Sequence, residues 1–177
     1  MCDNIQVQFY KELKHISFKN KHITFFDNSE IIFKNLISTI PLPVLIERSD
    51  APEKVKEAAR KLSCSSVLLI NITANHQTLL DYDWMYVYDE DKYSTRINCA
   101  EMLSPINAPS GQSGIQVEVY FSKYKEKLLD DNSIAECVID ELVEMGILAG
   151  KGDVINFHTK WVKWANVIFD FNRKKML

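Results

Sequence analysis

Residues 84–109 read WMYVYDEDKYSTRINCAEMLSPINAP, and this stretch decides how we interpret the rest of the chain. Its first five residues alternate between aromatic and aliphatic side chains: Trp84, Met85, Tyr86, Val87 and Tyr88. Successive side chains of a strand point to opposite faces, so the three aromatic rings are predicted to share one face. The acidic run at 89–91 predicts a turn, and a second strand is predicted over 93–98.

The second predicted strand carries Arg96. A guanidinium group is planar and can bind a phosphate or carboxylate through two parallel hydrogen bonds. Beside a row of aromatic rings, it is suited to hold a sugar, a base or an anion. The same pattern has a purely structural explanation. Alternating aromatics also pack ordinary strands against helices, and a single arginine usually lies on the surface with its aliphatic stem along apolar neighbours.

The spacing of this stretch resembles the substrate domain of UDP-galactopyranose mutases, above all the eukaryotic type. A Trp-x-Tyr pattern is followed, ten positions after Tyr86, by Arg96. Ser-Pro at 104–105 and Asn107 then precede Pro109. A second motif, LISTIPLP at 36–43, resembles the s-T-x-P-L hallmark of the wider flavin amine oxidase and protoporphyrinogen oxidase superfamily, in which a strand returns toward the flavin.

The resemblance runs from about Ile5 to about Arg173 and is closest to bacterial mutase-related proteins of lipopolysaccharide biosynthesis. One part departs from the family, which has a tyrosine-proline segment before an Arg-Asp pair near its C-terminus. This chain has Asn166 and Val167 there, followed by Arg173 and Lys174. The resemblance therefore does not extend to that part of the site.

The resemblance implies a substrate site and a cofactor. In the family, reduced flavin attacks the anomeric carbon of UDP-galactose, and the opened sugar recloses as a furanose, so the chemistry belongs to FAD. When the family's roles are carried over to the matching positions of this sequence, Arg96 and Tyr86 contact the diphosphate. Trp84 then forms one wall of the pocket, and Asn107 also binds substrate. The resemblance assigns no catalytic residue here. We expect no FAD bound to this chain, no activity without an FAD domain, and a nucleotide sugar as partner.

The expected fold is α+β: an antiparallel sheet flanked by two helices, preceded by a β-meander, with no dinucleotide-binding Rossmann unit. Alternating apolar residues from Ile5 through Val7 and Phe9 to position 33 predict the meander. A further strand is predicted at 36–40, closed by two prolines that cannot donate to a ladder. Two domains are expected. Residues 1–43 resemble part of a flavin-binding domain, and residues 44–177 form an antiparallel-sheet substrate-binding domain.

The second domain is predicted to contain two helices with capping boxes. The first has Asp50 as its cap and Glu53 three residues later, and the second starts at Ser133 and ends at Gly146. Its strands are predicted at 67–72, where the apolar run suggests burial on both faces, at 115–121, at 154–157 and at 161–169. Glu118 in the second of these strands is expected to be merely solvated.

The amino-acid composition limits which classes of protein and of binding partner are compatible with this chain. The chain has 177 residues, 46% hydrophobic and 25% charged, which is typical of a globular protein. Its net charge of −3 disfavours a nucleic-acid partner. Its four cysteines form no C-x-x-C pair, so we expect reduced thiols in a cytoplasmic protein. The sequence shows no charged-then-apolar leader pattern and no apolar run of 18 residues, so we expect neither secretion by a signal peptide nor a membrane span. The five glycines form no G-x-G-x-x-G loop.

Three functions remain open. The chain is part of a mutase-like flavoprotein of surface-polysaccharide synthesis, or the substrate domain of an amine oxidase or protoporphyrinogen oxidase relative, or a non-catalytic binding module. In the second case the aromatic residues would surround an amine or a flat ring. The spacing to Arg96 favours the first. A meander with an apolar face and open strand edges also makes a homo-oligomer an expectation.

Overall fold

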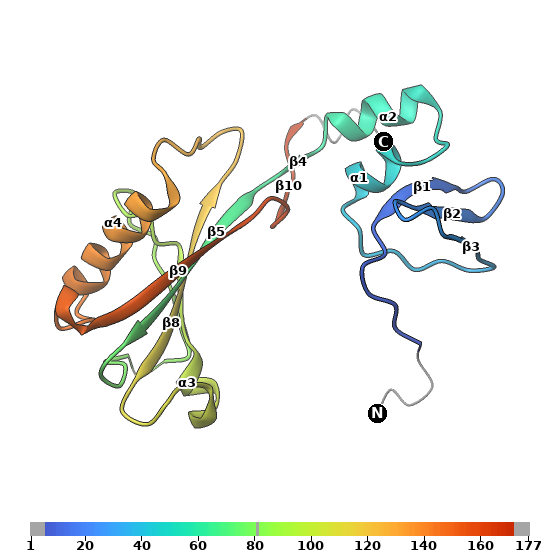
Figure 1. The fold of residues 1–177 in the computed structure, drawn as a ribbon. Coiled ribbons are helices and arrows are strands. Elements are labelled where there is room, and N and C mark those ends of the chain that lie inside the picture. Colours follow the sequence, from blue (N-terminus) through green and yellow to red (C-terminus); the bar gives the residue numbers. More distant parts are fainter. Residues whose placement is uncertain (1–5, 81, 172–177) are drawn as a thin grey trace. The chain divides into compact units, whose positions relative to one another are not determined.

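The computed structural model describes residues 6–80 and 82–171 and divides the chain into two compact units. Unit 1 comprises Met1–Leu62 and Phe169–Leu177, and unit 2 comprises Ser63–Ile168 (Figure 1). The described part is mixed α and β, with antiparallel sheets and four α-helices. The units therefore divide later in the sequence than residue 43, and the predicted division into a flavin-domain remnant and a substrate domain stays a prediction.

The meander of unit 1 is confirmed from residue 13 onward. It consists of β1 (Leu13–Ser17), β2 (His22–Phe25) and β3 (Glu30–Ile32), which pair antiparallel in that order. The predicted strand through Val7 and Phe9 was wrong, because both side chains are exposed and belong to no strand. Ile5 lies outside the described residues.

The prolines at 41 and 43 begin a helix, so the strand predicted at 36–40 was wrong. Helix α1 (Leu42–Glu47) has Pro41 at its N-cap and Pro43 in its first turn. Proline is tolerated there because the first N–H groups of a helix have no intrahelical partner. The local signal that ends a strand is thus also one that starts a helix.

Asp50 fastens the turn between β1 and β2 and does not cap a helix, so the predicted capping box at Glu53 was wrong. Helix α2 (Glu53–Arg60) begins after Pro52 without a side-chain cap. The Asp50 carboxylate accepts hydrogen bonds from the Ser17 hydroxyl (2.6 Å) and the backbone N–H groups of Phe18 (3.0 Å) and Lys19 (3.3 Å).

These hydrogen bonds, the one from the Ser17 hydroxyl first, lower the pKa of Asp50 from its ordinary 3.8. Because the pKa of Asp50 is lower in the folded than in the unfolded state, its contribution to the stability of unit 1 is complete at pH values above the unfolded-state pKa. This contribution is lost as the pH falls through the folded-state pKa. We expect a carboxyl NMR titration of Asp50 to have its midpoint below 3.8. In Asp50→Ala, amide exchange at Phe18 and Lys19 should accelerate. A midpoint at or above the ordinary value contradicts this assignment.

Unit 2 is built on a five-stranded antiparallel sheet in the order β6-β7-β8-β5-β9. Its strands are β5 (Ser66–Ala74), β6 (Trp84–Tyr86), β7 (Arg96–Cys99), β8 (Ser113–Phe121) and β9 (Val154–Val162). The two predicted last strands are one continuous strand, β9, followed by the short β10 (Val167–Ile168). The predicted burial of 67–72 on both faces was wrong in part, because Leu69 and Asn71 are only partly buried.

A separate two-stranded pair joins the ends of unit 2. Strand β4 (Ser63–Cys64) pairs antiparallel with β10. The backbone N–H of Ser65 donates to the carbonyl of Asn166 (2.8 Å), and the N–H of Ala165 donates to the carbonyl of Ser65 (2.9 Å). The point where the chain enters this unit and the point where it leaves are therefore held together.

Helix α4 (Asp131–Glu144) covers one face of the large sheet (Figure 1). It begins earlier than predicted, because Asp130 accepts from the N–H groups of Asn132 and Ser133, so the capping box at Ser133 was wrong. Gly146, with a φ of 70°, follows its end as predicted. The predicted placement of α2 beside this sheet stays a prediction, since α2 belongs to unit 1.

The core of unit 2 lies between α4 and the sheet. Both layers contribute fully buried side chains to it: Leu68, Ile70, Val117 and Val119 from the sheet, and Ile134, Val138 and Leu142 from the helix. The remaining short helices of this unit are α3 (Ala100–Leu103), η1 (Pro105–Asn107) and η2 (Lys151–Asp153). In the described part of the chain, none of the helices is both long and apolar enough to cross a membrane.

Candidate ligand-binding face of the five-stranded sheet

The sheet face that points away from α4 is polar. Residues paired across antiparallel strands point to the same face, so the register defines rows of neighbouring side chains. One row, here the arginine row, consists of Tyr86, Arg96, Glu118, Leu69 and Lys160. The next, here the amide row, consists of Trp84, Asn98, Gln116, Asn71 and His158. The two rows are about 7 Å apart, since a strand rises about 3.4 Å per residue.

Arg96 is held in the arginine row by its neighbours on both sides. Its guanidinium forms an ion pair with Glu118, and the second oxygen of that carboxylate accepts a hydrogen bond from the Tyr120 hydroxyl at 2.6 Å. Hydrogen bonding to Tyr86 and to Glu118 raises the pKa of Arg96. Arg96 is therefore a fixed cation, and its side chain is still 39% exposed to solvent.

Glu118 is the residue of this cluster that the sequence interpretation missed. It was expected to be solvated, but it is only 7% exposed and lies between Arg96 and Tyr120. Burial and the bond to Glu118 raise the pKa of Tyr120, so this hydroxyl keeps its proton and remains a donor. Strand alternation gives the face of Glu118 correctly, but a partner 22 residues away in the sequence, on the neighbouring strand, leaves no local signal.

The predicted aromatic face is confirmed. Trp84, Tyr86 and Tyr88 are 57%, 52% and 87% exposed, whereas Val87 is buried and Met85 packs against the core. The rings of Tyr86 and Tyr88 lie 6.4 Å apart between centroids. The structure thus brings three predicted site residues, Trp84, Tyr86 and Arg96, onto one hairpin.

Asn107 is placed differently from the other three predicted site residues. It ends η1, and its side-chain amide donates to the carbonyl of Ala100 at 3.0 Å, which closes the loop after α3. In the described part of the chain, no hydrogen bond or ion pair joins it to Arg96. A substrate contact from Asn107 stays a prediction.

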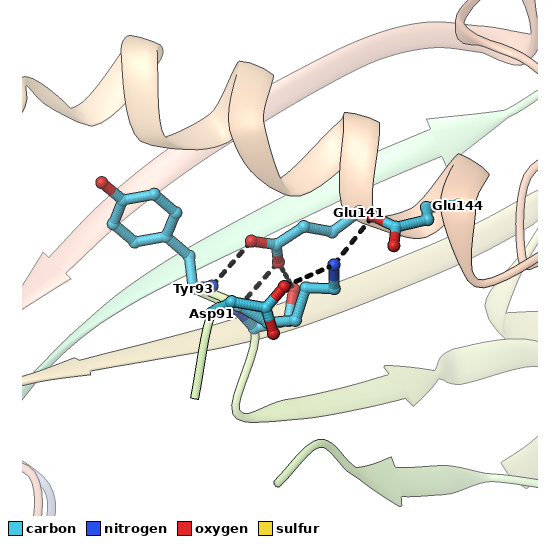
Figure 2. Close-up of polar contacts among 6 residues, drawn as sticks. Asp91, Tyr93, Glu141 and Glu144 are labelled. Carbon is cyan, nitrogen blue, oxygen red and sulfur yellow. Dashed lines mark hydrogen bonds and ion pairs between the residues drawn. The ribbon is translucent and has the colours of Figure 1, made fainter. Parts of the chain in front are cut away.

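Glu141 of α4 anchors the turn that carries this hairpin. Its carboxylate is 7% exposed and accepts hydrogen bonds from the N–H groups of Tyr93 (2.6 Å) and Ser94 (2.9 Å) and from the Ser94 hydroxyl (2.5 Å). Figure 2 shows this carboxylate reaching from the helix to the turn. Beside it, Lys92 forms ion pairs with Glu144 (2.8 Å) and Asp91 (3.2 Å). The strands that hold Tyr86 and Arg96 are thereby fixed to α4.

The amide row borders a hollow in the polar face. Gln116 donates through its side-chain amide to the Asn71 side-chain oxygen at 2.7 Å, which orders two members of the row. The side-chain oxygen of Asn98 is buried, and it has no hydrogen-bond partner among the described residues. The hollow has a volume of about 240 Å³. A cation beside a hollow lined by uncharged polar groups is suited to an anionic ligand with a neutral polar part.

Comparisons with known proteins agree with the fold. No protein-family model matches the sequence, and no curated protein matches it significantly. A solved structure of reduced UDP-galactopyranose mutase is similar with a TM-score of 0.84 and 20% identity, over 94% of this chain and 36% of the mutase chain. The chain thus spans about a third of that protein.

Two further solved structures are similar. A protein from Exiguobacterium sp. that is named as a protoporphyrinogen oxidase has a TM-score of 0.64 and 12% identity, over 93% of this chain and 38% of that one. An oxidoreductase from Methanosarcina mazei has a TM-score of 0.66 and 16% identity, over 87% of this chain and 37% of that one. The resemblance predicted from the two motifs is confirmed at the level of the fold: this chain has the fold of one part of these enzymes.

Proposed function

We propose that the polar face of unit 2 is the substrate-binding part of a nucleotide-sugar site, in a flavoprotein resembling UDP-galactopyranose mutase. The observation that carries the proposal is Arg96, a fixed and partly exposed cation between Tyr86 and Glu118. In this assignment Arg96 and Tyr86 bind the diphosphate, and Trp84 walls the pocket. The proposed setting is cytoplasmic synthesis of lipopolysaccharide or another surface polysaccharide.

The ion pair with Glu118 leaves Arg96 able to bind a diphosphate. A guanidinium group has five N–H donors, and the contacts to Glu118 and Tyr86 use only part of them. Lys160, exposed at the other end of the arginine row, adds a second positive charge to the same face. With Glu118 counted, the row carries a net charge of +1, which supports an anionic ligand.

The flavin chemistry lies outside the part that we assign to this chain. Binding of a dinucleotide pyrophosphate needs a glycine-rich turn between a strand and a helix. The five glycines are at 111, 114, 146, 150 and 152, and no such turn occurs among the described residues. We therefore assign no cofactor-binding residue here, and we expect the chain alone to be inactive.

An amine ligand, as in amine oxidase relatives, is the weaker alternative. Its support is the exposed pair of rings at Tyr86 and Tyr88, which resembles one wall of a cage. The fixed positive charge of Arg96 repels an ammonium group at the same place, and the nearby Glu118 carboxylate already pairs with Arg96. A flat uncharged ring remains compatible with this wall.

The proposal predicts weak but specific binding of UDP to the isolated chain. Ligand-observed NMR should detect UDP and UDP-galactose at millimolar concentration, because a charge-assisted hydrogen bond contributes roughly 1.5–3 kcal/mol. Uridine, which lacks the diphosphate, is the matched control and should give no signal under the same conditions. If UDP gives no signal, or if uridine binds as well as UDP, the assignment of Arg96 to the diphosphate is wrong.

A further inference from the structure

The hollow beside the amide row has a lining suited to hydroxyl groups. Its polar lining consists of Asn71, Thr73, Asn98, Gln116, Asn156 and His158, and no Lys, Arg, Asp or Glu side chain of the described residues belongs to it. Carboxamides both donate and accept hydrogen bonds, as sugar hydroxyls do. An uncharged lining of this kind favours a neutral polyol over an ion.

The size of the hollow limits what it can hold. Sites for drug-sized ligands have volumes of about 300–1,000 Å³. At about 240 Å³, the hollow is below that range and fits one ring of a larger ligand. The amide row, which lines its near side, lies one strand repeat, about 7 Å, from the arginine row. A ligand whose diphosphate contacts Arg96 can therefore place an attached ring in the hollow.

One side chain that lines the hollow has a polar atom for which the described residues provide no partner. The side-chain oxygen of Asn98 is buried and unpaired among the described residues, whereas the neighbouring Gln116 and Asn71 amides bond to each other. A buried acceptor without a donor lowers the stability of the fold, and most buried polar groups in proteins have a hydrogen-bond partner. A ligand hydroxyl that reaches Asn98 after a small side-chain rotation satisfies this group.

From these observations we infer that the hollow is a subsite for a hexose ring. Asn98 and Gln116 form hydrogen bonds with the hydroxyls of the ring, while the diphosphate contacts Arg96. Trp84, in register with Asn98, flanks the ring. The inference rests on the proposed nucleotide-sugar function, and it adds which part of the ligand lies on which row. Asn98 and Gln116 are thus assigned to the glycosyl part of the ligand.

The test compares UDP with UDP-galactose, so that the glycosyl contribution is measured separately. For the unaltered chain, UDP-galactose should bind about tenfold more tightly, which is the effect of one to two hydrogen bonds. Asn98→Ala should remove this difference and leave the affinity for UDP unchanged. Retained UDP binding also shows that the variant is folded, and Gln116→Ala is a second variant on the same row should the first fail to fold.

Asn132→Ala, an exposed amide in the first turn of α4, is the matched control and should change neither affinity. Equal affinities of the unaltered chain for UDP and UDP-galactose overturn the subsite. Equal loss of both affinities in Asn98→Ala overturns it as well. In each of these outcomes UDP still binds, so the proposed function stands. Absence of UDP binding to the unaltered chain overturns the proposed function and this inference together.

Discussion

Replacing Glu141 by alanine is expected to lower the free energy of unfolding of unit 2 by roughly 3 kcal/mol. The substitution removes the acceptor of three hydrogen bonds and leaves the N–H groups of Tyr93 and Ser94 without a partner beside the helix. It also frees the turn that connects β6 to β7. A large effect follows because the carboxylate is buried and each of its bonds is charge-assisted.

Urea unfolding monitored by tryptophan fluorescence measures this change in the free energy of unfolding in unit 2. The three tryptophans of the chain, at 84, 161 and 164, all belong to unit 2. Glu144→Ala is the matched control on the same helix. Glu144 is exposed and pairs with Lys92 at the surface, so its loss should cost less than about 1 kcal/mol. Similar costs for both variants would show that Glu141 has no special role.

Arg96→Ala is expected to weaken binding of UDP about tenfold or more. A charge-assisted bond to phosphate contributes roughly 1.5–3 kcal/mol, and 1.4 kcal/mol corresponds to a factor of ten. Arg60→Ala on α2 removes the same charge and should leave the affinity unchanged, because Arg60 pairs with Glu47 and Glu53 in unit 1. Equal losses in the two variants would mean general electrostatic attraction and no defined site.

The pairing of Arg96 with Glu118 requires one more control. Arg96→Ala leaves the buried Glu118 carboxylate unpaired, and that charge alone would repel a diphosphate. The double variant Arg96→Ala with Glu118→Gln removes both charges and keeps an acceptor for Tyr120. Direct contact between Arg96 and UDP predicts that the loss persists in the double variant. Recovery of binding in it would instead identify repulsion by Glu118 as the cause.

The sequence predicts those parts of the fold that depend on local periodicity. Strand β8 alternates apolar and polar residues, and β6 alternates aromatic and aliphatic ones. These patterns indicate both the strand and the face of each side chain. Local signals fail where one residue type serves two purposes. A proline can end a strand or begin a helix, and Pro41 begins α1. Asp50 has the side chain of a helix cap, but it accepts hydrogen bonds from a turn far away in the sequence.

The site is predicted only in part, because its geometry depends on strand register. Trp84, Tyr86 and Arg96 lie on one hairpin, and their spacing alone brings them together. Glu118 reaches Arg96 through a pairing that spans 22 residues, and such a partner is set by the whole sheet. Glu141 lies seven residues after Ile134 and three after Val138, so helical periodicity places it on the buried stripe of α4, and Glu144 off it. The pattern does not show which N–H groups the buried carboxylate binds, because these belong to a turn 47–48 residues earlier.

In the course of the chain, unit 2 is an insertion within unit 1, and the paired strands β4 and β10 lie at its two ends. The chain leaves unit 1 after residue 62 and returns to it at residue 169. Because β4 and β10 clasp the two ends of the inserted piece, the separation between these ends is short and fixed within unit 2. A piece with adjoining ends can be transplanted into a surface loop of another protein, or permuted, with little loss of chain entropy. Unit 2, which carries the candidate ligand-binding face, thus has the topology of an exchangeable module.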